Sequence, residues 1–183
     1  MKRIVSTAAL AALCILMAPQ AFAQMAGMTP PPTSTGPASE ALAAYNRVKP
    51  NVLKAADKMP EADYQYKPTP DIRTYARIVN HVTEAQFRTC SALAGDKMDP
   101  KSVPSDTADK ATIVAALKAS FAECDKAYAA LTDSTIAEML QLGPAKRSRI
   151  GLAWGNISHD NEQYAELATY LRLKGLVPPS GEK

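Results

Sequence analysis

Apolar residues recur along most of the chain at intervals of three and four positions, which is the spacing of one face of an α-helix. The expected helices cover about residues 39–58, 70–94, 113–131 and 146–174. Pro50 falls inside the first of these segments and should kink or split it, because proline cannot donate the helical hydrogen bond. Few alternating β-branched runs occur, so the pattern favours helices throughout.

The connections between these helices carry clear turn signals. Thr69, Pro70 and Asp71 supply a cap, a first-turn proline and an early acid for the second helix. The capping-box pattern of Thr135 and Glu138 predicts a short additional helix that ends before the Gly-Pro pair at 143–144. Four long amphipathic helices with short connections predict an all-α four-helix bundle.

The last predicted helix has two faces that could make contacts. One face carries Ile150, Trp154, Ile157, Tyr164, Ala168 and Leu171, and the other carries Leu152, Asn156, His159, Gln163, Leu167 and Tyr170. A helix with two such faces lies at the centre of a fold or is shared with a second subunit. We therefore expect a homodimer.

The first 23 residues have the pattern of an export signal. Lys2 and Arg3 precede an apolar stretch, and Ala21-Phe22-Ala23 is a small-x-small cleavage site. Leu13 precedes Cys14 where a lipoprotein signal would have a small residue, so we expect ordinary cleavage after Ala23. The expected organisation is a signal peptide at 1–23, a Pro-rich disordered linker at 24–37 and one domain at 38–183.

Charge and hydropathy narrow the choice of partners. Without Lys2 and Arg3 the chain has 19 basic and 18 acidic residues, and this near-neutral balance argues against nucleic-acid binding. No apolar run of about 18 residues follows the signal, so the mature chain should have no integral membrane segment. We expect a periplasmic or secreted protein in an oxidising compartment.

The mature chain keeps two cysteines, Cys90 and Cys124, on the apolar stripes of the second and third helices. An even pair in an exported protein favours a disulfide, which would close a loop of 34 residues. Two buried free thiols are the alternative.

Only two histidines occur, and both lie in the middle of predicted helices. His81 lies at the flank of its stripe beside small residues, and His159 shares a helix face with Gln163 one turn later. Two histidines from facing helices and a third ligand can hold a metal, although a hydrogen-bonded pair is the simpler interpretation. Near the start of the last helix, Lys146, Arg147 and Arg149 form a basic cluster that could bind an anion or pair with Glu138.

Several segments together resemble the DinB-like family, over about residues 40–180. The first part of the chain contributes the segments 59–64, 66–70 and Ile78-Val79-Asn80-His81. The last helix and tail contribute 159–164, 170–175 and Val177-Pro178-Pro179. The resemblance implies a four-helix bundle with a divalent metal at one end, often in a homodimer. It also implies a metal-dependent hydrolase or a thiol-dependent transferase acting on a small-molecule substrate.

The resemblance places the metal ligands at His81, His159 and Gln163. The family has a histidine at the third position, so this chain departs from the pattern there. An amide oxygen is a weaker ligand for zinc or nickel than an imidazole. Glu84 or Glu162 could compensate, and a set of two histidines and one carboxylate is typical of iron.

Two functions remain open at this point. In the first, the chain is a metal-dependent enzyme with a degenerate His/His/Gln site, in which Glu162 is the nearest candidate for a general base. In the second, the bundle is a non-catalytic binding or structural module that has lost the metal. The sequence identifies no catalytic residue and no substrate.

Overall fold

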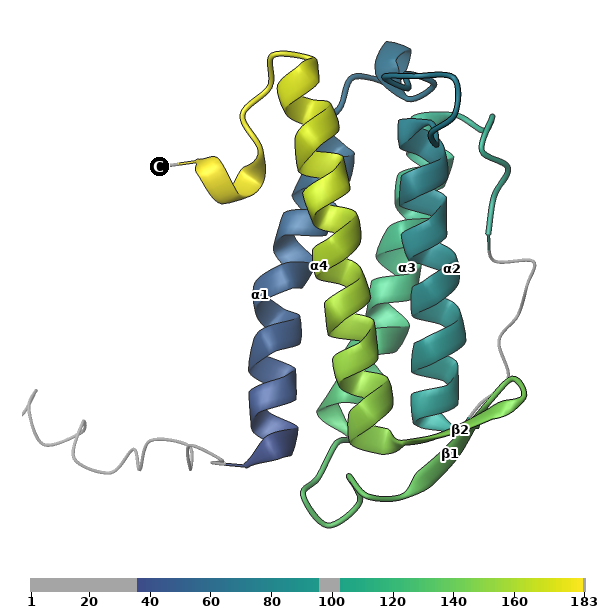
Figure 1. The fold of residues 1–183 in the computed structure, drawn as a ribbon, viewed down its shortest axis with the longest axis vertical. Helices are drawn as coiled ribbons and strands as arrows, with labels where there is room; N and C mark the ends of the chain where they lie inside the picture. Colours follow the sequence, from purple (N-terminus) through teal and green to yellow (C-terminus); the bar gives the residue numbers. More distant parts are fainter. Residues whose placement is uncertain (1–35, 96–102, 183) are drawn as a thin grey trace, which may run out of the picture. The chain divides into compact units, whose positions relative to one another are not determined.

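A computed structural model describes residues 36–95 and 103–182 and shows the expected four-helix bundle (Figure 1). The helices are α1 Pro37–Lys58, α2 Tyr75–Ala94, α3 Lys110–Ala129 and α4 Arg149–Leu173. Two strands, β1 Met139–Leu142 and β2 Ala145–Ser148, lie between α3 and α4 in the sequence. Short 3-10 turns lie at η1 Glu61–Asp63 and η3 Pro179–Gly181. The all-α interpretation is confirmed for the core. The expected signal peptide and all of the linker up to residue 35 lie outside the described residues.

The second helix begins later than expected. Thr74 caps α2, because its side-chain oxygen accepts a hydrogen bond from the backbone N–H of Arg77 at 3.1 Å. Pro70 therefore stays in the connector, and the start predicted at 69–71 is wrong by about one turn. Gly95 ends α2 with φ of 87°, as a left-handed C-terminal residue does.

Pro50 does not split the first helix. α1 continues through it from Pro37 to Lys58. The side chain of Pro50 is exposed, so the carbonyl that loses its hydrogen-bond donor can be solvated. Tertiary packing of the buried face overrides the local preference here, as it commonly does in amphipathic helices.

A β-hairpin replaces the short helix that we predicted after Thr135. β1 pairs antiparallel with β2, from Met139 opposite Ser148 to Leu142 opposite Ala145. Along β1, half-buried residues alternate with exposed ones, which is the period of a strand. Gly143 has φ of 58° in the two-residue turn, a conformation that favours glycine. Because β2 includes residue 146, α4 begins at Arg149 instead.

Buried aromatic side chains connect the helices in the core. Tyr45 of α1 stacks on Tyr128 of α3 with ring centroids 4.1 Å apart. The Tyr45 hydroxyl donates to the Phe121 carbonyl at 3.1 Å, and the Tyr128 hydroxyl donates to the Ala153 carbonyl at 2.7 Å. These hydrogen bonds satisfy hydroxyls that would be costly to bury alone, and they link α1 to α3 and α3 to α4.

The two expected faces of α4 differ in exposure. The face that points into the bundle carries Asn156 and Gln163, both buried. On the other face Tyr164 is buried, but Trp154 is 42% exposed. The homodimer stays a prediction. Over the described ranges, each helix is too short or too polar to cross a bilayer.

Candidate metal centre

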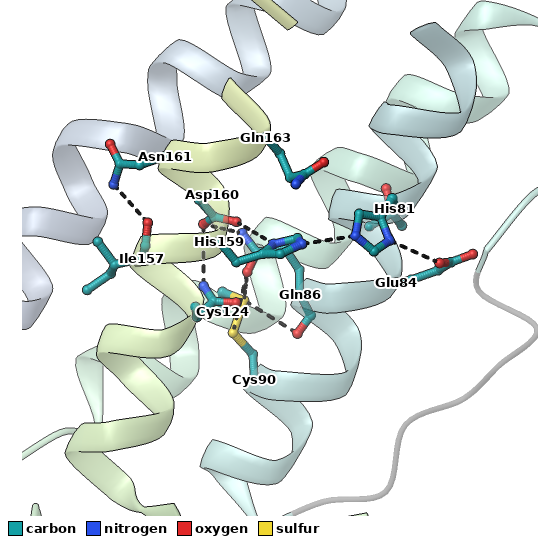
Figure 2. A network of polar contacts seen from close by, with 12 residues as sticks. His81, Glu84, Gln86, Cys90, Cys124, Ile157, His159, Asp160, Asn161 and Gln163 are labelled. Carbon is teal, nitrogen blue, oxygen red and sulfur yellow. Dashed lines mark hydrogen bonds and ion pairs between the residues drawn. A yellow bond between two sulfur atoms is a disulfide. The ribbon is translucent and has the colours of Figure 1, made fainter. Parts of the chain in front are cut away.

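The two histidines of the chain meet between α2 and α4 (Figure 2). Nε2 of His81 lies 3.1 Å from Nε2 of His159, and the ring planes are inclined by 67°. Two nitrogen ligands of one zinc ion lie about 2.9–3.4 Å apart, given bond lengths of 2.0–2.1 Å and angles of 90–110°. The observed separation therefore fits two imidazoles that share one ion.

Each imidazole has a carboxylate beside its other nitrogen. Nδ1 of His81 lies 3.7 Å from Oε2 of Glu84, and Nδ1 of His159 lies 3.9 Å from Oδ1 of Asp160. Figure 2 shows both carboxylates on the far side of their rings from the gap between the histidines. Both distances exceed hydrogen-bond length, so the carboxylates favour a proton on Nδ1 through their negative charge, which leaves the lone pair of Nε2 free for a metal.

This arrangement creates a conflict between the two rings. With protons on both Nδ1 atoms, two Nε2 lone pairs would face each other at 3.1 Å. A proton on one Nε2 removes the repulsion but takes a proton away from one Nδ1. Nδ1 of His159 is indeed buried without a hydrogen-bond partner among the described residues. A cation between the Nε2 atoms would satisfy both rings together.

The third expected ligand, Gln163, lies one turn beyond His159 on α4. Its side chain is buried and extends toward α2 above the two imidazoles in Figure 2. Oε1 of Gln163 lies 3.5 Å from the Arg73 guanidinium, which donates a weak hydrogen bond to it. Sequence reasoning missed Arg73, because the helix predicted over 70–94 placed it among the polar positions of the first turn, whereas in the structure it precedes α2. The separation of the two imidazole nitrogens thus fits a shared divalent ion, whereas the amide oxygen of Gln163 contacts the Arg73 guanidinium.

The charges around His81 are mostly positive. Burial, then the cations Arg73 and Arg77 and the neighbouring His159, lower the pKa of the His81 imidazole below its usual value. Arg77 binds Glu84 through two hydrogen bonds of 2.7 and 2.8 Å. His81 is therefore neutral and able to act as a ligand at pH 7, but nearby arginines also oppose a divalent cation.

Neither glutamate takes the place of Gln163. The Glu84 carboxylate is held by Arg77 and faces Nδ1 of His81, and Glu162 is exposed on α4. Within residues 36–95 and 103–182, no group of three or more His, Cys, Asp or Glu side chains could hold a metal ion. The set of two histidines and one carboxylate is thus not assembled there.

A buried polar network lies directly beneath His159. The Asp160 side chain is fully buried, and its Oδ2 accepts hydrogen bonds from Gln86 at 3.0 Å and from Asn156 at 3.4 Å. Sequence reasoning treated Asp160 only as part of the family segment, although it is one turn after Asn156 on the same helix face. The network ends at the expected disulfide between Cys90 and Cys124, which joins α2 to α3 and is confirmed.

Replacing Asp160 by Asn should stabilise the metal-free protein at pH 7. Burial is the main cause that raises the pKa of Asp160, so folding disfavours its ionised form. Asparagine removes the charge and keeps an acceptor for Gln86, and we expect a gain of about 1–2 kcal/mol. Urea unfolding of both proteins measures the difference.

The sign of the effect with pH is a second check on Asp160. Folding raises the pKa of Asp160 above the unfolded value of about 3.9. Its ionisation therefore costs no stability below about pH 3.9, and the loss of stability grows as pH rises through the folded pKa. The advantage of Asp160→Asn should therefore shrink between pH 7 and pH 4. The exposed Asp71→Asn is the matched control. Destabilisation by Asp160→Asn at pH 7 would contradict this account.

The three residues of the basic cluster, Lys146, Arg147 and Arg149, have different environments in the structure. Arg149 pairs with Glu138 at 2.6 Å, which was one of the two expected roles, and it also donates to the Leu93 carbonyl. Lys146 and Arg147 lie on β2 and are exposed. Arg147 lines a pocket beside His159 that also contains Arg88 of α2.

Comparisons with known proteins agree with this fold. The chain resembles a DinB-like protein from Bacillus cereus (16% identity, TM-score 0.64, covering 76% of this chain and 93% of that one). It also resembles a conserved protein from Enterococcus faecalis (13%, 0.62, 76% and 98%) and a DinB-like protein from Bacillus subtilis (14%, 0.61, 74% and 92%). A search of curated proteins found no significant match. The sequence profile of the DinB superfamily matches residues 44–167, and the chain belongs to this superfamily.

Proposed function

We propose that this chain is an exported metal-dependent hydrolase or transferase with a weakened metal site at His81, His159 and Gln163. One observation carries the proposal: two Nε2 atoms from different helices approach to 3.1 Å while both Nδ1 atoms lie beside carboxylates. In a pair of histidines with a purely structural role, one Nδ1 would have no need of a carboxylate. The set of residues is the one that the family resemblance implies.

Each residue has a separate task in this proposal. The negative charges of Glu84 and Asp160 favour a proton on each Nδ1, and Arg73 donates a weak hydrogen bond to the amide oxygen of Gln163. When bound, a divalent ion such as zinc, nickel or iron would supply Lewis-acid polarisation of a substrate oxygen or acidify a bound water. Arg73 is exposed beside Gln163 and carries a positive charge that an anionic substrate group could contact.

The disulfide supports export. Cys90 and Cys124 are both buried and bonded, and such a bond persists in oxidising compartments and is rare in the reducing cytosol of mesophiles. A periplasmic or secreted location also agrees with the signal pattern at 1–23.

Zinc and nickel titration of chelator-treated protein tests the site. We expect one ion per chain in the unaltered protein and at least a 100-fold loss of affinity in His81→Ala and in His159→Ala, because each removes a direct ligand. Competition with a chromophoric chelator gives the dissociation constants. Glu162→Gln is the matched control, since its side chain is exposed on the same helix and should leave binding unchanged.

A non-catalytic module is the second candidate, and the position of Arg73 favours it. The Arg73 guanidinium lies 3.5 Å from Oε1 of Gln163, the proposed third ligand, and its positive charge repels a metal cation there. In a metal-free module, Arg73 would supply the positive charge that the ion supplies in the metal-bound site. Absence of stoichiometric zinc or nickel binding, or binding that survives both histidine substitutions, would overturn the metal proposal and leave this candidate.

A further inference from the structure

A pocket lies between α2, the β-hairpin and α4, and His159 forms part of its wall. Its volume is about 240 Å³, below the range of sites for drug-sized ligands. In Figure 1 the hairpin lies beside the ends of α2 and α4 that form this region. The lining is mixed and contains apolar side chains, two arginines and the polar residues Thr89, Asn156 and His159.

Two arginines from different elements supply positive charge. Arg88 comes from α2 and Arg147 from β2, and both are exposed. Neither forms an ion pair with a carboxylate of the described residues. Guanidinium groups bind carboxylates with charge-assisted hydrogen bonds, often in pairs. Two guanidiniums around one small pocket that form no ion pair within residues 36–95 and 103–182 therefore indicate an anionic ligand.

Half of the lining residues are apolar or glycine. They are Ala85, Leu142 and Leu152, with Gly151 and Gly155, which contribute no side chain from α4. Such a surface suits the hydrocarbon part of a ligand better than it suits a fully polar ion such as inorganic phosphate. The arginines and the apolar residues together favour a small organic acid.

One of the lining residues, Asn156, has an unsatisfied side-chain acceptor. Asn156 is only 3% exposed, and its Oδ1 has no hydrogen-bond partner in the part of the chain that the structure describes. Its Nδ2 donates to Asp160, which fixes the orientation of the amide. A buried acceptor without a donor costs stability, and a donor on a ligand would remove that cost.

We propose that this pocket binds a small carboxylic acid that has an apolar body and a hydroxyl or amine donor. The carboxylate binds Arg88 and Arg147, the body packs against Leu142 and Leu152, and the donor reaches Asn156. The pocket shares His159 with the proposed metal site, but binding of the carboxylic acid needs no metal. The acid is therefore titrated into chelator-treated protein, so that a failure to bind metal and a failure to bind the acid are distinguished.

The probes are 6-hydroxyhexanoate, hexanoate and 6-hydroxyhexanamide, titrated into 15N-labelled metal-free full-length protein. We expect 6-hydroxyhexanoate to shift the NMR signals of the Asn156 side chain and of the Gly151 and Gly155 amides. Hexanoate lacks the donor and should bind at least threefold more weakly. The amide lacks the charge and should bind at least tenfold more weakly.

Three variants separate the pocket from general effects of charge. Arg147→Gln should weaken 6-hydroxyhexanoate about tenfold, and Arg172→Gln, an exposed arginine outside the pocket, should not. Gly155→Leu should abolish binding without unfolding the chain, because a Cβ at 155 would meet no atom within 4 Å.

Three results would overturn the proposal: equal binding of the acid and the amide, shifts spread away from the pocket, and full retention of binding in Gly155→Leu. Equal affinity of hexanoate and 6-hydroxyhexanoate would overturn the role of Asn156. Inorganic phosphate is titrated as a fourth probe, and its stronger binding would overturn the choice of a carboxylic acid as the ligand.

Discussion

Reducing the Cys90–Cys124 disulfide is expected to lower the free energy of unfolding by about 3–4 kcal/mol in the chain-entropy treatment of a 34-residue loop. The bond joins α2 to α3, so the reduced unfolded chain regains the freedom that this cross-link removes. Domains commonly have only about 5–15 kcal/mol of stability, so the loss is a large fraction. The melting temperature should fall by roughly 6–16 °C for a chain of this length.

Urea unfolding with and without a phosphine reductant measures this effect, with thiol titration to confirm two free cysteines. The double variant Cys90→Ala and Cys124→Ala is the control, because its stability should not depend on the reductant. Unchanged stability of the fully reduced natural chain would contradict the expected contribution of the disulfide.

Gln163→His is expected to tighten zinc or nickel binding at least 100-fold. The substitution replaces an amide oxygen by an imidazole one turn after His159, so that two histidines on α4 and one on α2 face the same gap. It also removes the acceptor that Arg73 now contacts. Competition with a chelator gives the affinity, and the absorption spectrum of bound cobalt(II) gives the coordination number.

Gln163→Ala is the matched comparison for this prediction. If the amide is a ligand, alanine should bind metal more weakly than glutamine, and histidine more tightly. Equal affinities of the alanine and histidine variants would show that position 163 does not reach the ion. The series therefore tests the third ligand separately from His81 and His159.

The helices could be predicted from the sequence because their buried faces repeat every three or four residues. The disulfide could be predicted from two cysteines on such faces. The β-hairpin could not be predicted, because Thr135 and Glu138 have the spacing of a capping box, which indicates the start of a helix. A capping box is a reliable signal only when apolar residues at helical spacing follow it, and here they do not. The alternating exposure of β1 spans four residues, too few to outweigh it.

The site shows a similar division. The resemblance indicated that the two histidines share one site. Helical spacing alone placed His81 only at the edge of its apolar stripe. Arg73 escaped notice because it was expected in the first turn of a helix over 70–94, whereas in the structure it precedes α2 and contacts Gln163. Asp160 escaped notice because an isolated aspartate in a helix is most often solvated, and its burial depends on Gln86 and Asn156.

The covalent bond between α2 and α3 has a consequence for local opening. α2 is tied to α3 by a disulfide on one side and packs against α4 on the other. A helix held in this way cannot detach alone while the bond is intact. Its central amide protons should therefore exchange with deuterium only when the whole bundle opens, whereas those of the hairpin Met139–Ser148, mostly exposed, exchange through local openings.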